Sequence, residues 1–218
     1  MQEKTHIYFV PGLAANSSIF DLIKLPEEQY ELHYIEWLVP ESESETIEDY
    51  AIRMSEFVKH ENSILIGVSF GGVMVQEMKK ICNPKKIVLI SSIKNKNEMP
   101  SRMHFAQKTN AHKILPMKAF SNLEKYEKFA FGKMLKGRVK LYKKYLSMRD
   151  ELYLPWAIDT IVNWKEEKAD PDILHIHGTK DAIFPIGNIG ECIKIEGGTH
   201  IMVLTRAREI NKILQEKL

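Results

Sequence analysis

Short apolar runs and amphipathic stretches alternate along the chain. The apolar runs are rich in Ile, Val and Leu, and they lie at residues 7–10, 32–37, 64–68, 87–90, 173–177 and 192–195. Runs this short that stay apolar on both faces are typical of buried strands in a parallel sheet. Because helical stretches separate them, the pattern predicts an α/β fold with a mostly parallel six-stranded sheet and helices on both of its faces.

The helical stretches show the spacing of amphipathic helices. Thr46 is a predicted N-cap, with Asp49 three residues on. The helix behind it is expected to turn one stripe inward, made of Ile47, Tyr50, Ala51, Met54, Phe57 and Val58. A second helix is expected to end near Cys82. Residues 201–218 are predicted to form a single closing helix, whose inward side chains are Leu204, Ile210, Ile213 and Leu214.

The segment between the fourth and fifth predicted strands is too long for a simple crossover helix. Residues 94–170 have helical patterning and no predicted strand, so we expect a helical lid inserted into a core of residues 1–93 and 171–218. Its last helix, residues 155–164, is apolar nearly all round and is expected to pack against the sheet. Residues 102–144 carry twelve Lys and Arg against two acidic residues. This basic stretch is either a solvated helical face or a surface that attracts an anionic substrate or another charged surface.

Composition narrows the class of protein. The 218 residues are 44% hydrophobic and carry a formal net charge of +2, which suits one globular domain and does not point to nucleic acid. No apolar run reaches about 18 residues, so no membrane span is expected, and the first apolar run is too short for a secretory signal. We therefore expect a cytoplasmic protein whose partner is a small-molecule substrate. The pattern gives no expectation for the oligomeric state.

The cysteines and histidines predict neither a disulfide framework nor a metal site. Cys82 and Cys192 are expected to be small buried side chains. The only metal-like spacing among the eight histidines is His175-x-His177, where both side chains share a face of a predicted strand without further ligands. The sequence therefore predicts no metal and no cofactor.

The stretch around Ser69 predicts an abrupt turn between a strand and a helix. An apolar run ends in Gly67, Ser69 stands between Gly67 and Gly71, and helical spacing begins after Gly72. In such a turn the serine takes a strained conformation that presents its hydroxyl, and side chains at the two flanking glycine positions would collide with the backbone. The alternative is a glycine-rich turn with an ordinary surface serine.

Polar residues that follow the predicted strands favour the strained turn that presents Ser69 over an ordinary surface serine. Functional groups of parallel sheets gather at the carboxyl ends of the strands. Ser69 follows the third strand, Asp181 the fifth and His200 the sixth. A histidine can act as a base toward a serine, and a carboxylate can orient that histidine. We therefore expect these three side chains to meet at one edge of the sheet.

Other side chains compete for these roles. The alternative acids are Glu196, Asp170 and Asp172. His175 and His177 lie within a predicted strand, where a structural role is expected. The lid histidines could line a pocket, although a surface role is expected for them; they are His104 and His112.

These motifs together resemble those of the α/β-hydrolase superfamily. The matching segments are residues 11–13, 67–71, 177–181, Pro185 and 197–200. The resemblance implies that Ser69 is a nucleophile, His200 its base and Asp181 the acid that orients the base. It also implies an oxyanion hole formed by the backbone N–H groups of Leu13 and Phe70, and it places the cap of the family at the insertion.

The chain departs from the family pattern in two places. Pro11 stands where the family often has histidine, which changes the side chain without affecting the N–H of Leu13. The first antiparallel hairpin of the family is also missing from the predicted strands. The chain thus resembles a compact member of the superfamily.

The sequence predicts a serine hydrolase that cleaves a small carboxylic ester or thioester through an acyl-enzyme. Two alternatives stay open. The same three residues could serve acyl transfer, C–C bond hydrolysis or a lyase step. The chain could also be a receptor-like binding protein with vestigial hydrolysis, although such a protein would not need Ser69 and His200 together.

Overall fold

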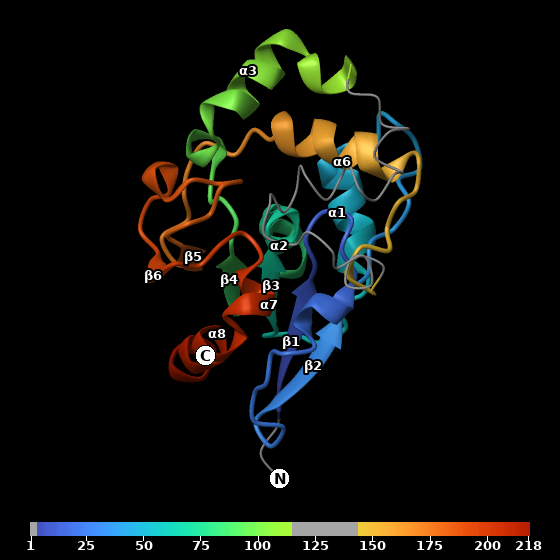
Figure 1. Ribbon diagram of the computed structural model, residues 1–218. Coiled ribbons are helices and arrows are strands. Elements are labelled where there is room, and N and C mark those ends of the chain that lie inside the picture. Colours follow the sequence, from blue (N-terminus) through green and yellow to red (C-terminus); the bar gives the residue numbers. More distant parts are fainter. Residues whose placement is uncertain (1–3, 115–143) are drawn as a thin grey trace.

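The computed structural model describes residues 4–114 and 144–218, and its centre is a six-stranded sheet (Figure 1). Neighbouring strands pair in parallel throughout, in the order β2-β1-β3-β4-β5-β6. The predicted α/β fold with a six-stranded parallel sheet is confirmed. The strands are β1 (Thr5–Val10), β2 (Tyr30–Tyr34), β3 (Ile64–Val68), β4 (Lys86–Ile90), β5 (Leu174–Gly178) and β6 (Ile193–Ile195).

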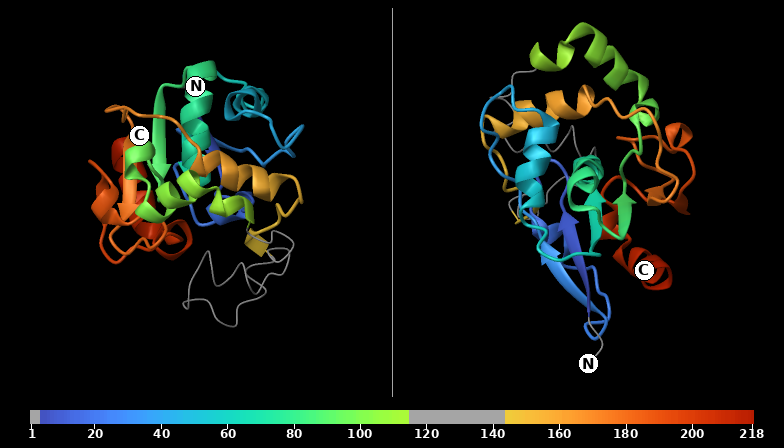
Figure 2. Two further views of the ribbon diagram at one scale, coloured as in Figure 1. Left: turned by 90° about the horizontal axis from the view of Figure 1, so that it is seen from above. Right: turned by 180° about the vertical axis from the view of Figure 1, so that it is seen from behind.

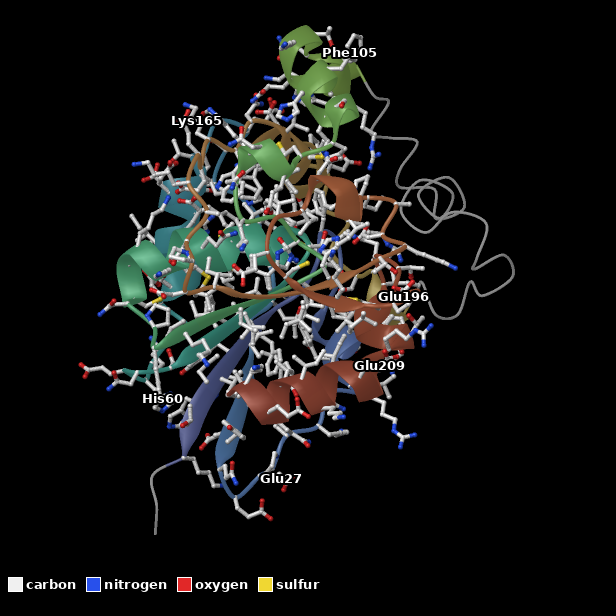
Figure 3. All side chains as sticks on the ribbon, turned by 90° about the vertical axis from the view of Figure 1, so that its left-hand side faces the viewer. Glu27, His60, Phe105, Lys165, Glu196 and Glu209 are labelled. Carbon is white, nitrogen blue, oxygen red and sulfur yellow. The ribbon has the colours of Figure 1, made fainter. Side chains whose placement is uncertain are left out.

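Helices cover both faces of the sheet, as predicted. Figure 3 shows α1 and α2 on one side of the strands and α8 on the other. The α-helices that lie wholly within the described residues are α1 (Ile47–Ser55), α2 (Phe70–Cys82), α3 (Ser101–Thr109), α6 (Tyr153–Val162), α7 (Met202–Thr205) and α8 (Ala207–Lys217). Short 3-10 helices are η1 (Ser17–Phe20), η2 (Lys96–Glu98), η3 (Ala111–Ile114) and η6 (Ile186–Asn188).

The apolar runs of the sequence form the core. All of β3 is buried, while the edge strand β2 is only half-buried or exposed. The Thr46 side chain accepts a hydrogen bond from the Asp49 N–H, so the predicted N-cap of α1 is confirmed. No helix within residues 4–114 and 144–218 is long and apolar enough to cross a membrane.

Several local expectations were wrong. Helix α1 ends at Ser55, so Phe57 leaves the inward stripe and is exposed. The closing segment forms two helices rather than one, because the backbone leaves helical geometry at Arg206 (φ −130°). Cys82 and Cys192 are free thiols, as expected, but they are half-buried rather than buried.

The connection between β4 and β5 contains α3 and α6, which lie beyond the carboxyl ends of the strands (Figures 1 and 2). Trp156 and Ala157 of α6 are buried, as the apolar pattern predicts. Most of the basic stretch at residues 102–144 falls outside the described residues. The division of the chain into a core and a lid stays a prediction.

Candidate active site

Ser69 occupies a sharp turn between β3 and α2, with φ 53° and ψ −119°. A Cβ atom at Gly67 would lie 2.2 Å from the backbone oxygen of Gly71, and one at Gly71 would lie 2.3 Å from that of Pro11. No side chain fits at such distances, so both glycines are required by the close approach of the backbone. The predicted turn is present, and it presents Ser69 half-buried at the carboxyl end of β3.

The three side chains that follow β3, β5 and β6 meet there. Nε2 of His200 lies 2.9 Å from Oγ of Ser69, and Nδ1 of His200 lies 2.8 Å from Oδ2 of Asp181. The imidazole therefore bridges the hydroxyl and the carboxylate through its two nitrogens. With Nδ1–H donating to the carboxylate, Nε2 is left as an acceptor for the hydroxyl proton.

The carboxylate of Asp181 is buried and held from its other side. Its Oδ1 accepts hydrogen bonds from the N–H groups of Ile183 and Phe184, at 2.8 and 2.9 Å. Burial alone would raise the pKa of Asp181, but the attraction and hydrogen bond of His200, together with the Phe184 amide, lower that pKa below its ordinary value. The group is therefore an anion at neutral pH.

His177 also lies near Asp181, with 3.6 Å between Nε2 and Oδ2, but it does not compete for the same role. Burial lowers the pKa of His177, and its Nε2 donates to the backbone oxygen of Phe184 at 2.9 Å. His175 contacts Nδ1 of His177 at 3.2 Å, and burial lowers the pKa of His175 to about 3. Both are neutral structural histidines, consistent with the role expected from their position in a strand.

Three of the other candidates are engaged elsewhere. Glu196 is exposed and accepts a hydrogen bond from Thr179, and Asp170 pairs with Lys79. His112 was expected at the surface, but it is buried, and its Nε2 lies 2.7 Å from Asp159.

The two amides expected from the resemblance belong to backbone next to Ser69. Phe70 is the first residue of α2, so its N–H has no acceptor within the helix. Leu13 lies in the turn after β1, where a Cβ at Gly12 would be only 3.6 Å from Cβ of Ser69. Trp37 holds this turn by donating its Nε1–H to the Gly12 oxygen at 2.9 Å. Both N–H groups thus belong to backbone that packs beside Ser69.

Sequence reasoning missed two side chains that hold the site. One is Trp37, described above. The other is Ser92, which follows β4 and donates its hydroxyl to the backbone oxygen of Ser69 at 2.7 Å. A Cβ at Gly72 would lie 2.3 Å from Oγ of Ser92, so this glycine leaves room for the contact. The position of Ser92 directly after a strand could have marked it as a candidate. However, no sequence pattern indicates that a serine hydroxyl will bond to the backbone of another segment.

Solvent reaches the site, since 17% of the His200 side chain is exposed. Phe184 packs edge-on against the His200 ring, with 5.6 Å between ring centroids. A surface hollow of about 590 Å³ borders α8 and shares none of its lining residues with Ser69, Asp181 or His200. That hollow is therefore not the pocket of this site.

Comparison with known proteins identifies the fold. No protein-family model and no curated protein sequence matches the chain. Among solved structures, a bromoperoxidase from Bacillus anthracis is 17% identical with a TM-score of 0.72, covering 97% of this chain and 91% of its own. A thermophilic esterase from Thermogutta terrifontis is 12% identical with a TM-score of 0.66, covering 99% and 90%. An esterase from Exiguobacterium antarcticum is 16% identical with a TM-score of 0.67, covering 99% and 92%. The chain has the α/β-hydrolase fold.

Proposed function

We propose that this protein is a serine hydrolase that cleaves a small carboxylic ester or thioester. The observation that carries the proposal is the continuous series of contacts from Ser69 through His200 to the buried Asp181. A serine hydroxyl is a weak nucleophile and needs a base within hydrogen-bond reach. The esterases among the structures of the same fold support the same class of reaction.

In the acylation step, Oγ of Ser69 attacks the carbonyl carbon of the substrate while its proton passes to Nε2 of His200. The electron pair of the carbonyl moves onto its oxygen, and the N–H groups of Leu13 and Phe70 stabilise that oxyanion. Each such donor contributes on the order of 3 kcal/mol to transition-state stabilisation in serine hydrolases. When the tetrahedral intermediate collapses, the bond to the alcohol or thiol breaks, and His200 returns the proton to the leaving group.

In the deacylation step, water takes the place of the leaving group. His200 removes a proton from the water as it attacks the acyl carbon, and then protonates Oγ of Ser69 as the carboxylic acid leaves. Asp181 remains an anion throughout, orienting the imidazole and stabilising its charged form. The low pKa of Asp181 suits this role, because a protonated acid would provide no such stabilisation.

We propose further that residues 94–170 form a lid over the site. The first part of this insertion contacts the loop of the acid: Arg102 donates to the backbone oxygens of Ala182 and Ile183. Its last part contacts the loop of Leu13, since the Asn16 N–H donates to the Tyr145 oxygen at 2.9 Å. Because these contacts lie at two separate strand ends, they support the proposal that the insertion spans the site and borders the substrate.

A fluorophosphonate probe tests the nucleophile. Wild-type protein is expected to be labelled with loss of p-nitrophenyl ester hydrolysis, and Ser69→Ala is expected to be neither labelled nor active. Ser44→Ala is the control, because Ser44 is exposed and its hydroxyl contacts Ser42 rather than the site, so labelling should persist. Labelling that survives in Ser69→Ala would reject the assignment of Ser69.

The same experiment separates the alternatives. A wild-type protein that is folded but resists the probe would favour the binding-protein interpretation. Labelling combined with poor hydrolysis of every ester, over a range of acyl chain lengths, would favour acyl transfer or another reaction of the same three residues. Hydrolysis that depends on chain length would identify the acyl group that the site accepts.

A further inference from the structure

Three histidines from separate segments meet at the opposite end of the sheet from Ser69. His6 belongs to β1 and His33 to β2, and His60 lies in the loop between α1 and β3. Each offers one ring nitrogen, and the three nitrogens lie within 4.8 Å of one another. Figure 3 shows His60 at the end of the molecule away from Phe105 of α3, which lies beyond the carboxyl ends of the strands.

The register of the first two strands brings this cluster together. His6 pairs with Glu31, and Tyr8 pairs with His33. Because alternate residues of a strand share a face, all four side chains stand on the same face of the sheet. The His60 ring stacks on His6, with 3.4 Å between the ring centroids and 5° between the planes.

The distances suit a divalent metal ion. Nδ1 of His6 lies 3.0 Å from Nε2 of His33. The same two nitrogens lie 4.0 and 3.8 Å from the carboxylate oxygens of Glu31. Ligands about 2.0 to 2.1 Å from a tetrahedral zinc ion are about 3.3 to 3.4 Å apart. Because an imidazole binds a metal in its own plane, one of the stacked rings of His6 and His60 must turn out of the stack when the ion binds. The Glu31 side chain is 53% exposed and free to move toward the ion.

The chemistry of the side chains also suits a metal ion. A neutral imidazole keeps a lone pair for a metal, and imidazole is a preferred ligand of zinc, copper and nickel ions. A nearby carboxylate adds the negative charge that a cation requires.

Tyr8 provides the outer contact that such sites use. Its hydroxyl lies 2.6 Å from Nδ1 of His60 and accepts a hydrogen bond from the Lys59 N–H at 3.0 Å. When Nδ1–H of His60 donates to this oxygen, the lone pair of Nε2 becomes available. Hydrogen bonds to the second ring nitrogen commonly fix the orientation of metal-bound histidines.

We propose that His6, His33, His60 and Glu31 form a site for a divalent transition-metal ion of the zinc type. The ion joins the edge strand β2 to β1 and to the loop before β3, so its role is to stabilise this end of the sheet. It takes no part in ester cleavage, because the site lies among the first residues of β1 whereas Ser69 follows the carboxyl end of β3.

Metal titration of the full chain tests the proposal. Protein treated with EDTA and dialysed is titrated with Zn²⁺ in competition with a chromogenic chelator. One equivalent is expected to bind and to raise the unfolding temperature. Co²⁺ is expected to bind with the visible absorption of a tetrahedral ion, which a surface ion in water does not show. Absence of a bound equivalent in wild-type protein overturns the proposal without reference to any variant.

Variants locate the ion. His33→Ala is expected to weaken Zn²⁺ binding by at least about 100-fold, and Glu31→Gln by about tenfold. His104→Ala, which removes a histidine of α3 outside the cluster, is the matched control and should bind as wild type. If His33→Ala does not fold, judged by circular dichroism, His60→Asn in the loop replaces it. Binding that is equal in wild type and in these cluster variants places the ion elsewhere and overturns the proposal.

The result is independent of the proposed function. Ester hydrolysis by metal-free protein is expected to match that of zinc-loaded protein within about twofold. A failure of fluorophosphonate labelling leaves the metal titration unaffected, and a failure of metal binding leaves the labelling unaffected. Loss of hydrolysis on removal of the metal would contradict the structural role assigned to the ion.

Discussion

At the scale of the residue, Ser69 has a backbone conformation that L-amino acids rarely adopt. A non-glycine residue with φ 53° and ψ −119° costs on the order of 1 to 3 kcal/mol, so the surrounding structure must supply that energy. The hydrogen bond from Ser92 to its carbonyl oxygen and its N–H bond to the Ile90 oxygen hold the strained peptide in place. The arrangement keeps the hydroxyl toward His200 at the expense of local stability.

Replacing the acid tests its role. Asp181→Asn is expected to keep the fold, because the amide oxygen can still accept from the N–H groups of Ile183 and Phe184. Turnover is expected to fall by about 10⁴, since a neutral amide neither stabilises the imidazolium nor holds its tautomer. The measurement is kcat on a p-nitrophenyl ester. Glu196→Gln is the control, and its kcat should stay near that of the wild type. A large loss in Glu196→Gln with little change in Asp181→Asn would assign the role of the acid to Glu196.

A glycine pair tests the close approach of backbone in the serine turn. Gly67→Ala is expected to cost about 3 kcal/mol or more, because its Cβ would meet the backbone oxygen of Gly71 at 2.2 Å, and backbone yields less than a side chain. Gly187→Ala is the matched control: nothing lies within 4 Å of its added Cβ, so a change within about 0.5 kcal/mol is expected. The free energy of unfolding of each variant is measured by urea denaturation. Equal losses in the two variants would show that close backbone contact does not require glycine at position 67.

At the scale of the element, the connection between β4 and β5 forms hydrogen bonds with loops that follow different strands. Near its start, Glu98 accepts a hydrogen bond from the Gly190 N–H, at the far end of the acid loop. Near its end, Trp156 of α6 donates its Nε1–H to the backbone oxygen of Glu45. The connection therefore helps to hold the loops around the site in position.

Arg102 of α3 allows a test of this coupling. Its guanidinium donates to the backbone oxygens of Ala182 and Ile183, directly after Asp181. Arg102→Ala is expected to lower kcat/KM by roughly threefold to tenfold, because hydrogen bonds from an exposed charged group contribute about 1 kcal/mol. Lys108→Ala removes the same charge from the same helix without that contact, and no change is expected. Equal losses in steady-state kinetics would mean that charge alone matters.

At the scale of the whole molecule, two neutral histidines are buried in β5, which lies between β4 and β6. Burial lowers the pKa of His175 to about 3 and also lowers that of His177. In the unfolded chain both return to about 6.5, so below that pH the unfolded state binds protons that the folded state does not. The two histidines therefore cost no stability above about pH 6.5. As the pH falls below about 6.5 toward their pKa values in the folded state, the free energy of unfolding decreases.

This linkage predicts how stability depends on pH. Between about pH 6.5 and 5, the free energy of unfolding is expected to fall, with each histidine contributing up to about 1.4 kcal/mol per pH unit. His175→Asn is expected to reduce the slope, since it removes one of the two groups. Urea denaturation at pH 7, 6 and 5 provides the measurement. A free energy that stays constant over this range would mean that the histidines are protonated in the folded protein.

The sequence predicted the strands, the serine turn and the order of the three site residues, because each depends on a local pattern. An apolar run identifies a buried strand wherever it pairs, and glycines on both sides of Ser69 identify a turn that only they permit. It failed at element ends, as for Phe57, where the end of α1 rather than the stripe decides exposure. Trp37 and Ser92 were missed because their partners are backbone atoms of other segments.

What the sequence determined by itself is therefore the fold class and the set of candidate groups for the site. Only the tertiary structure decided which groups meet. Asp181 reaches His200 because the amides after it hold its carboxylate, whereas Glu196, nearer along the chain, points to Thr179. The meeting of His6, His33 and His60 depends on strand register and on the loop between α1 and β3. No local pattern encodes such a meeting, since distances between segments arise only when strands pair and the chain packs.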